Sequence, residues 1–480
     1  MVLISIALTF LSCGDDSSDN TGETTKPTTG GADTEQQSTT SKYDIKDNLG
    51  EYDFDGYVFR NIARQGNHIE QQEQTGEVLN DAVFFRNRAV EERFNIKFAE
   101  TIAPTDAGAA TAAVRNSILT NDKAYDIVTV RGPDIFTIAS EGLIHPISNL
   151  PYLDYDKPYW DEWLLNQFSI MNKNFMAAGA YDYRLYGAQA LLFNKQLARN
   201  LGIGDIYSLV RQGKWTFDKF EEFSKMAIRD LNGDAVITED DQVGFVGIAR
   251  ILVANWTVAG GVKSIEKDAD DIPYLNALDP KFIDVWLRMA NMMVTNDAWF
   301  HNVANPDLHP NPLWDSMFRD NKALFYQGGL GSAQTFRDME NDFGIVPLPK
   351  FNEEQENHNS PLGWIETVTV PIYADDDDLD RTSIILEALA SESYRKVTPV
   401  YVDLVLGSKF IRDDESEEMI DIILNNRTFD WGDPIFLLRD EIFRHILVQN
   451  SDTIVSRVQA SESGINAKIN KMVDAFSLLD

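Results

Sequence analysis

The sequence predicts an α/β fold with two lobes. Strand-like and helix-like segments alternate along most of the chain, which is typical of an α/β protein. These segments fall into two groups of similar size, and the folded part, from about Tyr43 to Asp480, exceeds the usual size of one domain. A cleft between two lobes is a favoured place for a small ligand, so we expect the functional site there.

The first group of segments covers residues 56–130. Gly56–Arg64 is rich in β-branched and aromatic residues, which predicts a strand. In Asn80–Phe94 apolar side chains recur on one side at helical spacing, and Asn80 is the expected N-cap. The group continues with a strand at Asn95–Glu100, a helix at Thr111–Asn121 and a nearly continuous apolar strand, typical of a buried parallel sheet, at Ala124–Val130.

The second group begins at residue 188. Ala188–Asn194 predicts a strand, Lys195–Leu201 begins a helix, and Thr216–Ile228 is an amphipathic helix with three phenylalanines on one face. Further segments follow: a helix at Lys281–Thr295, strands at Lys322–Gln327, Phe343–Pro347 and Glu366–Pro371, and helices at Asp380–Ala390, Glu417–Leu424, Pro434–Gln449 and Asn466–Leu478.

Residues 1–42 predict an export signal followed by a tether. Residues 1–12 are apolar but too short to span a membrane, as expected of a signal peptide. The only cysteine, Cys13, follows directly, and this junction resembles a bacterial lipobox, in which the cysteine is acylated. Residues 14–42 hold no aromatic or branched aliphatic residue, which predicts a disordered tether. We therefore expect a lipid anchor on the extracellular face of the bacterial cytoplasmic membrane.

Charge and motifs exclude several function classes. The net charge of −34 argues against nucleic-acid and anionic-membrane binding, which both favour basic patches. The sequence lacks the G-x-S-x-G, H-E-x-x-H, phosphate-loop and G-x-G-x-x-G motifs, and its histidines have no metal-ligand spacing. A binding protein without enzymatic activity is therefore favoured. Two alternatives remain open: a secreted glycoside hydrolase, which needs two carboxylates across a cleft, and a calcium-dependent surface binding protein.

One motif, Asp230–Asp241, has the spacing of a calcium loop. Asp230, Asn232 and Asp234 place side-chain oxygens at positions one, three and five. The backbone carbonyl of Val236 would be the ligand at position seven and Asp241 the ligand at position twelve. Ala235 replaces the usual glycine at position six, where a left-handed backbone is favoured, and Asp241 replaces the usual glutamate. The sequence thus predicts an isolated calcium site with a structural role, and a polar turn is the alternative.

The same region carries a family resemblance. The segments LFNKQLARNLGI, YSLVRQGKWTFDKF and RDLNGDAVITEDDQVGF, between Leu192 and Phe245, resemble in content and order the family 1 extracellular solute-binding proteins of ABC importers. YDIVTV, DKPYWDEW, NKALFYQGG and FGIVPLPK agree with it as well, so that the resemblance covers roughly Asp55 to Ala390. It implies a periplasmic-binding-protein-like fold with an interlobe cleft, a small solute for which a sugar is the expected class, and an ABC permease as the partner of a monomeric protein.

The resemblance also implies several hinge crossings, which we expect at Ala177–Ala188, Ala323–Gly329 and Gly363–Pro371. The corresponding boundaries are 1–13 for the signal and anchor, 14–42 for the tether, 43–180 and 328–365 for lobe 1, and 181–327 and 366–480 for lobe 2, with C-terminal helices that can span both lobes.

Candidate ligand-binding residues were selected at strand ends and expected crossings. Planar polar groups hydrogen-bond to sugar hydroxyls, and aromatic rings stack on the C–H faces of sugars. The selected residues are Arg64, Arg131, Asp182, Tyr183, Trp256, Gln327, Trp364 and Glu366. Trp160, Trp163 and Trp215 are expected to be packing residues, because most tryptophans belong to the core.

Overall fold

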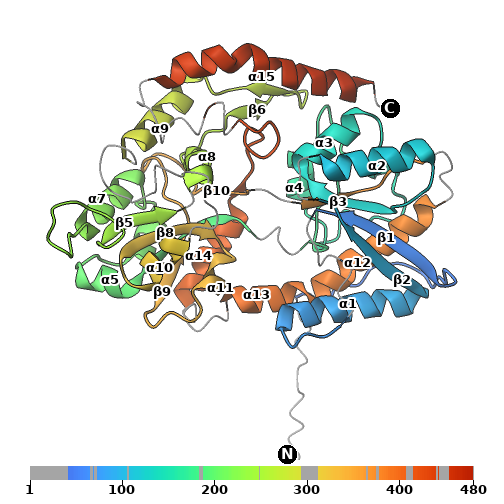
Figure 1. Cartoon of the computed structure of the whole chain (residues 1–480), viewed down its shortest axis with the longest axis horizontal. Coiled ribbons are helices and arrows are strands. Elements are labelled where there is room, and N and C mark those ends of the chain that lie inside the picture. Colours follow the sequence, from blue (N-terminus) through green and yellow to red (C-terminus); the bar gives the residue numbers. More distant parts are fainter. Residues whose placement is uncertain are drawn as a thin grey trace, which may run out of the picture. The chain divides into compact units, whose positions relative to one another are not determined.

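The computed structural model describes residues 42–64, 69, 73–104, 108–182, 187–247, 249–292, 312–363, 366–373, 378–406, 414–438, 442 and 453–478 (Figure 1). The predicted signal, Cys13 and the tether up to Ser41 lie outside these residues. Lys42–Asp480 forms one compact unit. Among the described helices none has the length and apolar character required to cross a membrane.

The first sheet has the strand order β11–β3–β1–β2 (Figure 1). β1 (Tyr57–Ala63) pairs in parallel with β2 (Ile96–Ile102) and β3 (Ile127–Arg131), and β11 (Glu366–Thr369) adds antiparallel to β3. The helices associated with this sheet are α1 (Val78–Phe94), α2 (Ala109–Thr120), α3 (Gly132–Ser140), η1 (Ile147–Asn149), α4 (Glu162–Gln167) and α12 (Leu379–Lys396). The predicted elements of this group are confirmed, with ends that shift by a few residues.

The N-terminus of α1 corrects one sequence prediction. Glu77, not Asn80, is the N-cap, and its carboxylate accepts a hydrogen bond from the backbone N–H of Asn80 at 2.9 Å. Glutamate can therefore cap this helix although aspartate, asparagine, serine and threonine are the usual residues.

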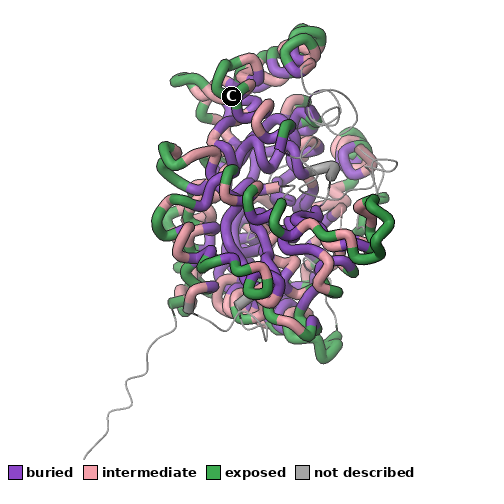
Figure 2. The backbone as a smooth tube through the Cα atoms, turned by 90° about the vertical axis from the view of Figure 1, so that its left-hand side faces the viewer, coloured by how far each residue is buried: buried purple, intermediate pink, exposed green. Residues whose placement is uncertain are grey.

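The second sheet has the order β5–β8–β4–β9. β4 (Gln189–Asn194) pairs antiparallel with β8 (Ala323–Gly329) and β9 (Phe343–Val346), and β5 (Val243–Gly247) runs parallel to β8. The accompanying helices are α5 (Lys195–Asn200), α6 (Ile206–Arg211), α7 (Phe217–Ala227), α8 (Ala249–Ala259), α9 (Pro280–Ala290), α10 (Pro312–Arg319) and α11 (Ser332–Thr335). Figure 2 shows that buried residues concentrate in the interior and exposed ones along the outer helices and loops.

The C-terminal segments connect elements of the two sheets. α13 (Thr398–Leu406) contacts both α1 and α11, α14 (Asp414–Asn425) packs on β9, and α15 (Ile454–Ser477) packs on both α3 and β7. The small paired strands are β6 (Ile265–Lys267) with β7 (Pro273–Leu275), and β10 (Ser360–Pro361) with β12 (Arg427–Thr428). Residues 432–436 form turns, and most of the predicted helix Pro434–Gln449 lies outside the described residues.

Two chain crossings lie between the sheets at predicted positions. Ala177 bridges Val368 of β11, whereas Ala188 bridges Leu362. The chain therefore leaves the first sheet after Ala177 and returns after Leu362, as two of the three expected crossings require. The third expected crossing, Ala323–Gly329, is wrong, because these residues form β8 and pair with β4 and β5 of the second sheet.

The strand pairing also corrects the expected lobe boundaries. β9 falls in the range 328–365 assigned to lobe 1, but it pairs with β4 of the second sheet. β11 falls in the range 366–480 assigned to lobe 2, but it pairs with β3 of the first sheet. Both errors follow from placing a crossing at β8, whose Gly328 and Gly329 end a buried strand and do not form a hinge.

A buried histidine predicts acid sensitivity. His358 is 6% exposed, and its Nδ1 lies 3.0 Å from the carbonyl oxygen of Leu348. Burial lowers the pKa of His358 from 6.5 to about 4. The folded state therefore favours neutral imidazole, and stability is lost as the pH falls from about 6.5, where the unfolded chain takes up the proton.

We expect the free energy of unfolding to decrease by about 2 kcal/mol between pH 7.5 and pH 5 through this residue. Urea unfolding of wild type and His358→Gln at both values measures it, since glutamine keeps a donor for Leu348 but does not titrate. Equal losses in the two proteins would contradict the assignment.

Candidate functional site

Three of the predicted site residues come together at one edge of the first sheet. β1 and β3 are parallel, so Arg64, which follows β1, and Arg131, which ends β3, lie at the same edge. Glu366 begins β11 and pairs in register with Arg131. The Arg64 Nη1 atom lies 4.0 Å from Glu366 Oε1, and Arg131 Nε lies 3.5 Å from Asp134 Oδ2.

This group of charges is balanced and largely buried. The side chains of Arg131 and Glu366 are 15% and 7% exposed. Burial, followed by repulsion from Arg64, lowers the pKa of Arg131, but an arginine stays protonated at neutral pH. Two guanidinium groups therefore lie near two carboxylates, Glu366 and Asp134, and the buried Asp182 lies beside them, so this edge has no excess of positive charge to attract an anionic ligand. The planar groups of such a set can donate to and accept from hydroxyl groups.

Asp182 lies next to this edge, in the first crossing. It is 4% exposed, and its backbone N–H donates to the carbonyl of Gly179 at 3.2 Å. The neighbouring Tyr181 hydroxyl lies 3.3 Å from Thr129 Oγ1 on β3, which ties the crossing to the first sheet. Tyr183 and Trp364, also predicted to bind ligand, lie outside the described residues.

The matching edge of the second sheet carries Gln327. β5 and β8 end where β4 begins, as the pairing of Gln189 with Gly329 shows. Gln327 is 1% exposed, and its Oε1 accepts a hydrogen bond from Trp256 Nε1 at 2.6 Å. β8 continues two residues beyond the predicted strand end at Gln327, so Gln327 lies within the strand, near its end.

Trp256 corrects a prediction. Its ring is fully buried and packs against Phe217, Phe220 and Phe245, with centroid distances of 5.3, 4.6 and 5.6 Å. A ring enclosed in this way has no free face for a ligand, so Trp256 acts by orienting Gln327. Trp215 is fully buried and Trp160 is 4% exposed, and both are packing residues as expected.

Two residues that the sequence analysis did not select complete the second edge. Gln189, the first residue of β4, and Asn255, on α8, are 8% and 7% exposed. Within the described part of the chain, Gln189 Oε1, Gln327 Nε2 and Asn255 Nδ2 have no hydrogen-bond partner. A buried amide atom without a partner costs roughly 1–3 kcal/mol, so three of them at one sheet edge require an explanation.

Two of these amides, those of Gln189 and Asn255, lie near Gly363, in the second crossing. An ideal Cβ on Gly363 would lie 3.9 Å from Gln189 Nε2. Asn255 and Gly363 line the same small cavity, of about 20 Å³, together with Asp433. Gln189 could have been found from the sequence, since it directly follows the expected crossing Ala177–Ala188 and is the second residue of the predicted strand Ala188–Asn194. Asn255 carried no such signal, because its helix was not predicted.

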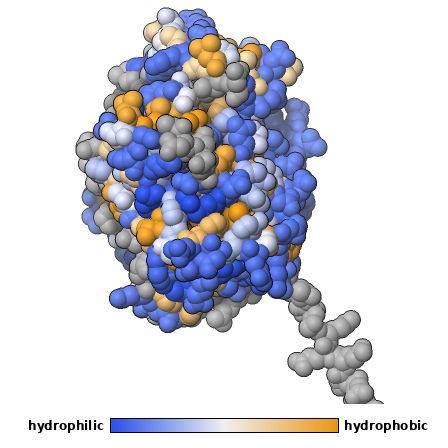
Figure 3. Space-filling view, turned by 90° about the vertical axis from the view of Figure 1, so that its right-hand side faces the viewer, coloured by the Kyte–Doolittle hydropathy of each residue, from blue (hydrophilic) through white to orange (hydrophobic). Residues whose placement is uncertain are grey.

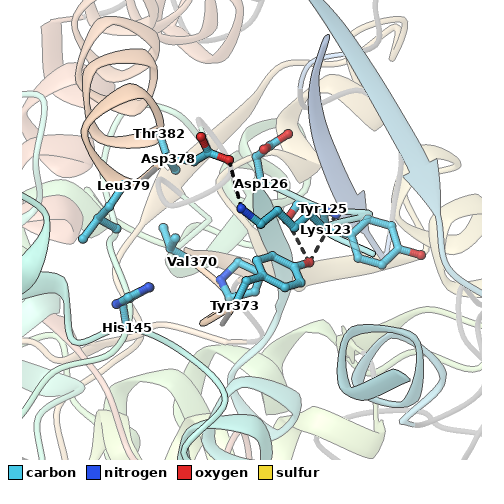
Figure 4. A pocket seen from close by; sticks show the side chains of 10 residues that line it. Lys123, Tyr125, Asp126, His145, Val370, Tyr373, Asp378, Leu379 and Thr382 are labelled. Carbon is cyan, nitrogen blue, oxygen red and sulfur yellow. Dashed lines mark hydrogen bonds and ion pairs between the residues drawn. The ribbon is translucent and has the colours of Figure 1, made fainter. Parts of the chain in front are cut away.

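Other cavities are not lined by these amides. Figure 4 shows one of about 30 Å³ whose lining includes Lys123, Tyr125, His145, Tyr373 and Asp378. Its polar groups are engaged with one another: Lys123 Nζ lies 3.6 Å from Asp378 Oδ2, and the Tyr373 hydroxyl donates to the Tyr125 carbonyl at 3.0 Å (Figure 4). Tyr125 precedes β3, so this cavity lies at the opposite edge of the first sheet from Arg131.

The loop predicted to bind calcium is held by its own backbone. Asp230 accepts hydrogen bonds from the N–H groups of Gly233 and Ala235 at 2.6 and 2.8 Å, and Ala235 adopts the expected left-handed conformation, with φ of 64°. Asp241 is fully buried and accepts from Leu231 and Thr238, both at 2.8 Å, which lowers its pKa. In the described ranges, no three histidine, cysteine, aspartate or glutamate side chains gather as a metal site.

Asn232 and Asp234 contact each other within this loop, with Asn232 Nδ2 donating to Asp234 Oδ2 at 3.1 Å. Val236, whose carbonyl was expected to bind the metal, is 58% exposed. Oxygen atoms of the predicted ligands at positions one to seven are thus near solvent, whereas the carboxylate of Asp241 is turned inward.

Comparison with known proteins identifies one family. Residues 93–382 match the family model described as bacterial extracellular solute-binding protein. A search of curated protein sequences finds no match.

Solved structures share the fold at low sequence identity. The galacto-N-biose-/lacto-N-biose I-binding protein of the ABC transporter from Bifidobacterium longum, in complex with lacto-N-biose, aligns with a TM-score of 0.60 and 12% identity over 87% of this chain and 98% of its own. The ABC substrate-binding protein Lmo0181 from Listeria monocytogenes, in complex with cycloalternan, aligns with a TM-score of 0.55 and 11% identity over 86% of this chain and 99% of its own. UgpB from Mycobacterium tuberculosis, in complex with glycerophosphocholine, aligns with a TM-score of 0.54 and 13% identity over 88% of this chain and 99% of its own.

Proposed function

Because the chain belongs to the bacterial extracellular solute-binding protein family, we propose that it captures a sugar or oligosaccharide and delivers it to the permease of an ABC transporter. The family consists of binding receptors, so the function is binding and not catalysis. The glycoside hydrolase alternative is therefore set aside.

The three buried amide atoms without partners are the observation that supports a sugar. Gln189 Oε1 can accept a hydrogen bond, and Gln327 Nε2 and Asn255 Nδ2 can donate one. Hydroxyl groups both donate and accept, so a sugar matches such a mixed set. The group of Arg64, Arg131, Glu366 and Asp134 supports an uncharged ligand, because it has no excess of positive charge to attract an anion.

Structural neighbours give two solute classes to compare. The Bifidobacterium longum and Listeria monocytogenes proteins were solved with carbohydrates, and UgpB was solved with a phosphodiester. A phosphodiester carries a permanent negative charge and would favour an excess of positive groups, which the balanced site does not offer. The carbohydrate class is therefore our proposal.

A thermal-shift screen tests the proposal. Its arms are monosaccharides, linear and cyclic oligosaccharides, polyols, glycerophosphodiesters and short peptides. A ligand at a hundred times its Kd stabilises the folded state by about 2.7 kcal/mol, which raises the melting temperature measurably. Stabilisation by a phosphodiester or a peptide, with none by any sugar, would refute the solute class, and turnover of a glycoside would refute the binding role.

For the N-terminus we propose acylation of Cys13 and anchoring on the extracellular face of the cytoplasmic membrane. Support comes from the lipobox-like junction and the composition of residues 14–42. Figure 3 agrees with a water-facing body, since the face it shows is mainly hydrophilic with small apolar groups. Mass spectrometry of the mature N-terminus identifies the acyl chains.

For the loop Asp230–Asp241 we propose a calcium ion with a structural role. Asp230, Asn232, Asp234 and the Val236 carbonyl would supply oxygens from the exposed side of the loop, and Asp241 would join by releasing one backbone N–H group. The left-handed Ala235 and its N–H bond to Asp230 support the loop shape that such a site needs.

Isothermal titration of chelator-treated protein should detect one calcium site, which Asp230→Ala removes. Calcium should raise the melting temperature of wild type but not of the variant. Asp268→Ala is a matched control, because Asp268 caps a different acidic turn by accepting N–H bonds from Asp270 and Ile272. A flat titration of wild type would leave the loop as a metal-free turn.

A further inference from the structure

Lys267, at the end of β6, bonds to elements associated with both sheets. Its Nζ donates to the carbonyl oxygen of Ser169 at 2.5 Å and pairs with Asp271 Oδ1 at 2.9 Å. Asp271 lies in the same β6–β7 hairpin, which connects α8 to α9 beside the second sheet. Ser169 belongs to the segment that reaches β11 of the first sheet through the hydrogen bond from Thr369 Oγ1 to the Phe175 carbonyl, at 2.6 Å.

Further contacts around Lys267 join the same two parts. The backbone carbonyl of Asp271 accepts a hydrogen bond from the N–H group of Met171 at 3.1 Å. The carboxylate of Asp271 accepts another from the N–H group of Asn172 at 3.0 Å. The ring centroid of Trp431 lies 4.7 Å from Lys267 Nζ, and Trp431 Nε1 donates a hydrogen bond to the carbonyl of Gln167 at 2.8 Å. We call this set, centred on Lys267, Asp271 and Trp431, the hairpin junction.

The hairpin junction is separate from the chain crossings at Ala177–Ala188 and Leu362–Val368, because Lys267 and Asp271 lie in the hairpin between α8 and α9 and not in either crossing segment. In Figure 1, β6 lies beside α15, and α15 packs on both α3 and β7. The junction can therefore form or break while the crossings stay intact.

The ammonium of Lys267 is well placed to control this junction. Its side chain is 19% exposed, and burial lowers the pKa of Lys267 while Asp271 raises it. A charged hydrogen bond that is shielded from water is stronger than one at the surface, so losing it has a large effect on the contacts that it supports.

We propose that Lys267 is a positioning residue for solute binding. Its ammonium holds the β6–β7 hairpin to the Ser169–Asn172 segment and so stabilises the arrangement in which the two sheet edges face each other. Contacts made in only one arrangement shift the equilibrium toward it, and the affinity for a ligand that needs that arrangement shifts by the same factor. This role rests on the proposed function, because Lys267 would change the affinity for the solute without contacting it.

Lys267→Met tests the role, because methionine keeps the length of the side chain but loses the charge. Lys219→Met is the matched control, since Lys219 forms an exposed pair with Glu222 one turn away on α7. Small-angle X-ray scattering without ligand should give a larger radius of gyration for Lys267→Met than for wild type or the control. Titration with maltotriose and lacto-N-biose as probes should show at least a tenfold weaker Kd, which Lys267→Arg partly restores.

A merely structural role would lower the melting temperature of Lys267→Met but leave its radius of gyration and its Kd at the wild-type values. That result would overturn the proposal. If wild type binds no member of the solute screen, the proposed function fails, and the radius of gyration alone then decides the role of Lys267: equal values for Lys267→Met and wild type refute it.

Discussion

Gln189→Leu should weaken solute binding by about ten- to a hundredfold, because removal of one hydrogen-bonding partner from a buried polar contact costs roughly 1–3 kcal/mol. Leucine has nearly the volume of glutamine but cannot satisfy a hydroxyl group. In the protein without solute, Gln189 Oε1 has no described partner, so the substitution should leave the stability unchanged or raise it. Calorimetric titration with the best ligand of the screen gives the Kd.

Gln196→Leu is the control for this experiment. Gln196 lies on α5 and pairs with Asn200 on the exposed face of the same helix. Its replacement should change neither the Kd nor the enthalpy of binding. An unchanged Kd in Gln189→Leu would remove the unpaired amides from the solute site, whereas equal weakening in both variants would indicate an indirect effect.

Asp430→Ala should decrease the free energy of unfolding by about 3–5 kcal/mol, as expected when one partner of a buried charged network is lost. Asp430 accepts four hydrogen bonds: from the N–H and the hydroxyl of Ser264 at 3.0 and 2.7 Å, and from the N–H groups of Ile265 and Gly432 at 3.1 and 3.0 Å. Alanine leaves all of these donors without an acceptor inside the protein.

Urea unfolding of Asp430→Ala, Asp430→Asn and Asp218→Ala separates the causes. Asparagine keeps one acceptor oxygen, so the free energy of unfolding should decrease less in Asp430→Asn than in Asp430→Ala. The carboxylate of Asp218 is 83% exposed in its pair with Arg288, and its removal should cost no more than about 0.5 kcal/mol. Similar losses in all three variants would show that the four hydrogen bonds do not stabilise the fold.

Most of the strands could be predicted because their local signal agrees with their burial. β4 reads QALLFN and all of its residues are buried, so a continuous apolar run was sufficient to identify it. β5 reads VGFVG and is equally buried, but its two glycines weaken the local signal. What makes β5 a strand is its pairing with β8, which is a tertiary contact that the local sequence does not encode.

The site was predictable at the edge of the first sheet and only partly at the second. Parallel strands bring their carboxyl ends to one edge, so Arg64 and Arg131 could be placed together from strand order alone. Trp256 was misassigned because an aromatic ring near glycines suits either a ligand contact or a core position. The packing of Phe217, Phe220 and Phe245 around it decides between them, and that packing depends on the whole second sheet.

The order in which the strands of the first sheet are synthesised determines when that sheet can be completed. β1, β2 and β3 are complete by Arg131, but β11 begins only at Glu366, after the entire second sheet has been synthesised. Contacts between residues so far apart in sequence form slowly, because a long loop must close before they gain energy. An emerging N-terminal portion therefore keeps one flank of β3 unpaired until most of the polypeptide is available. Such a delay keeps this part of the polypeptide incompletely folded for longer.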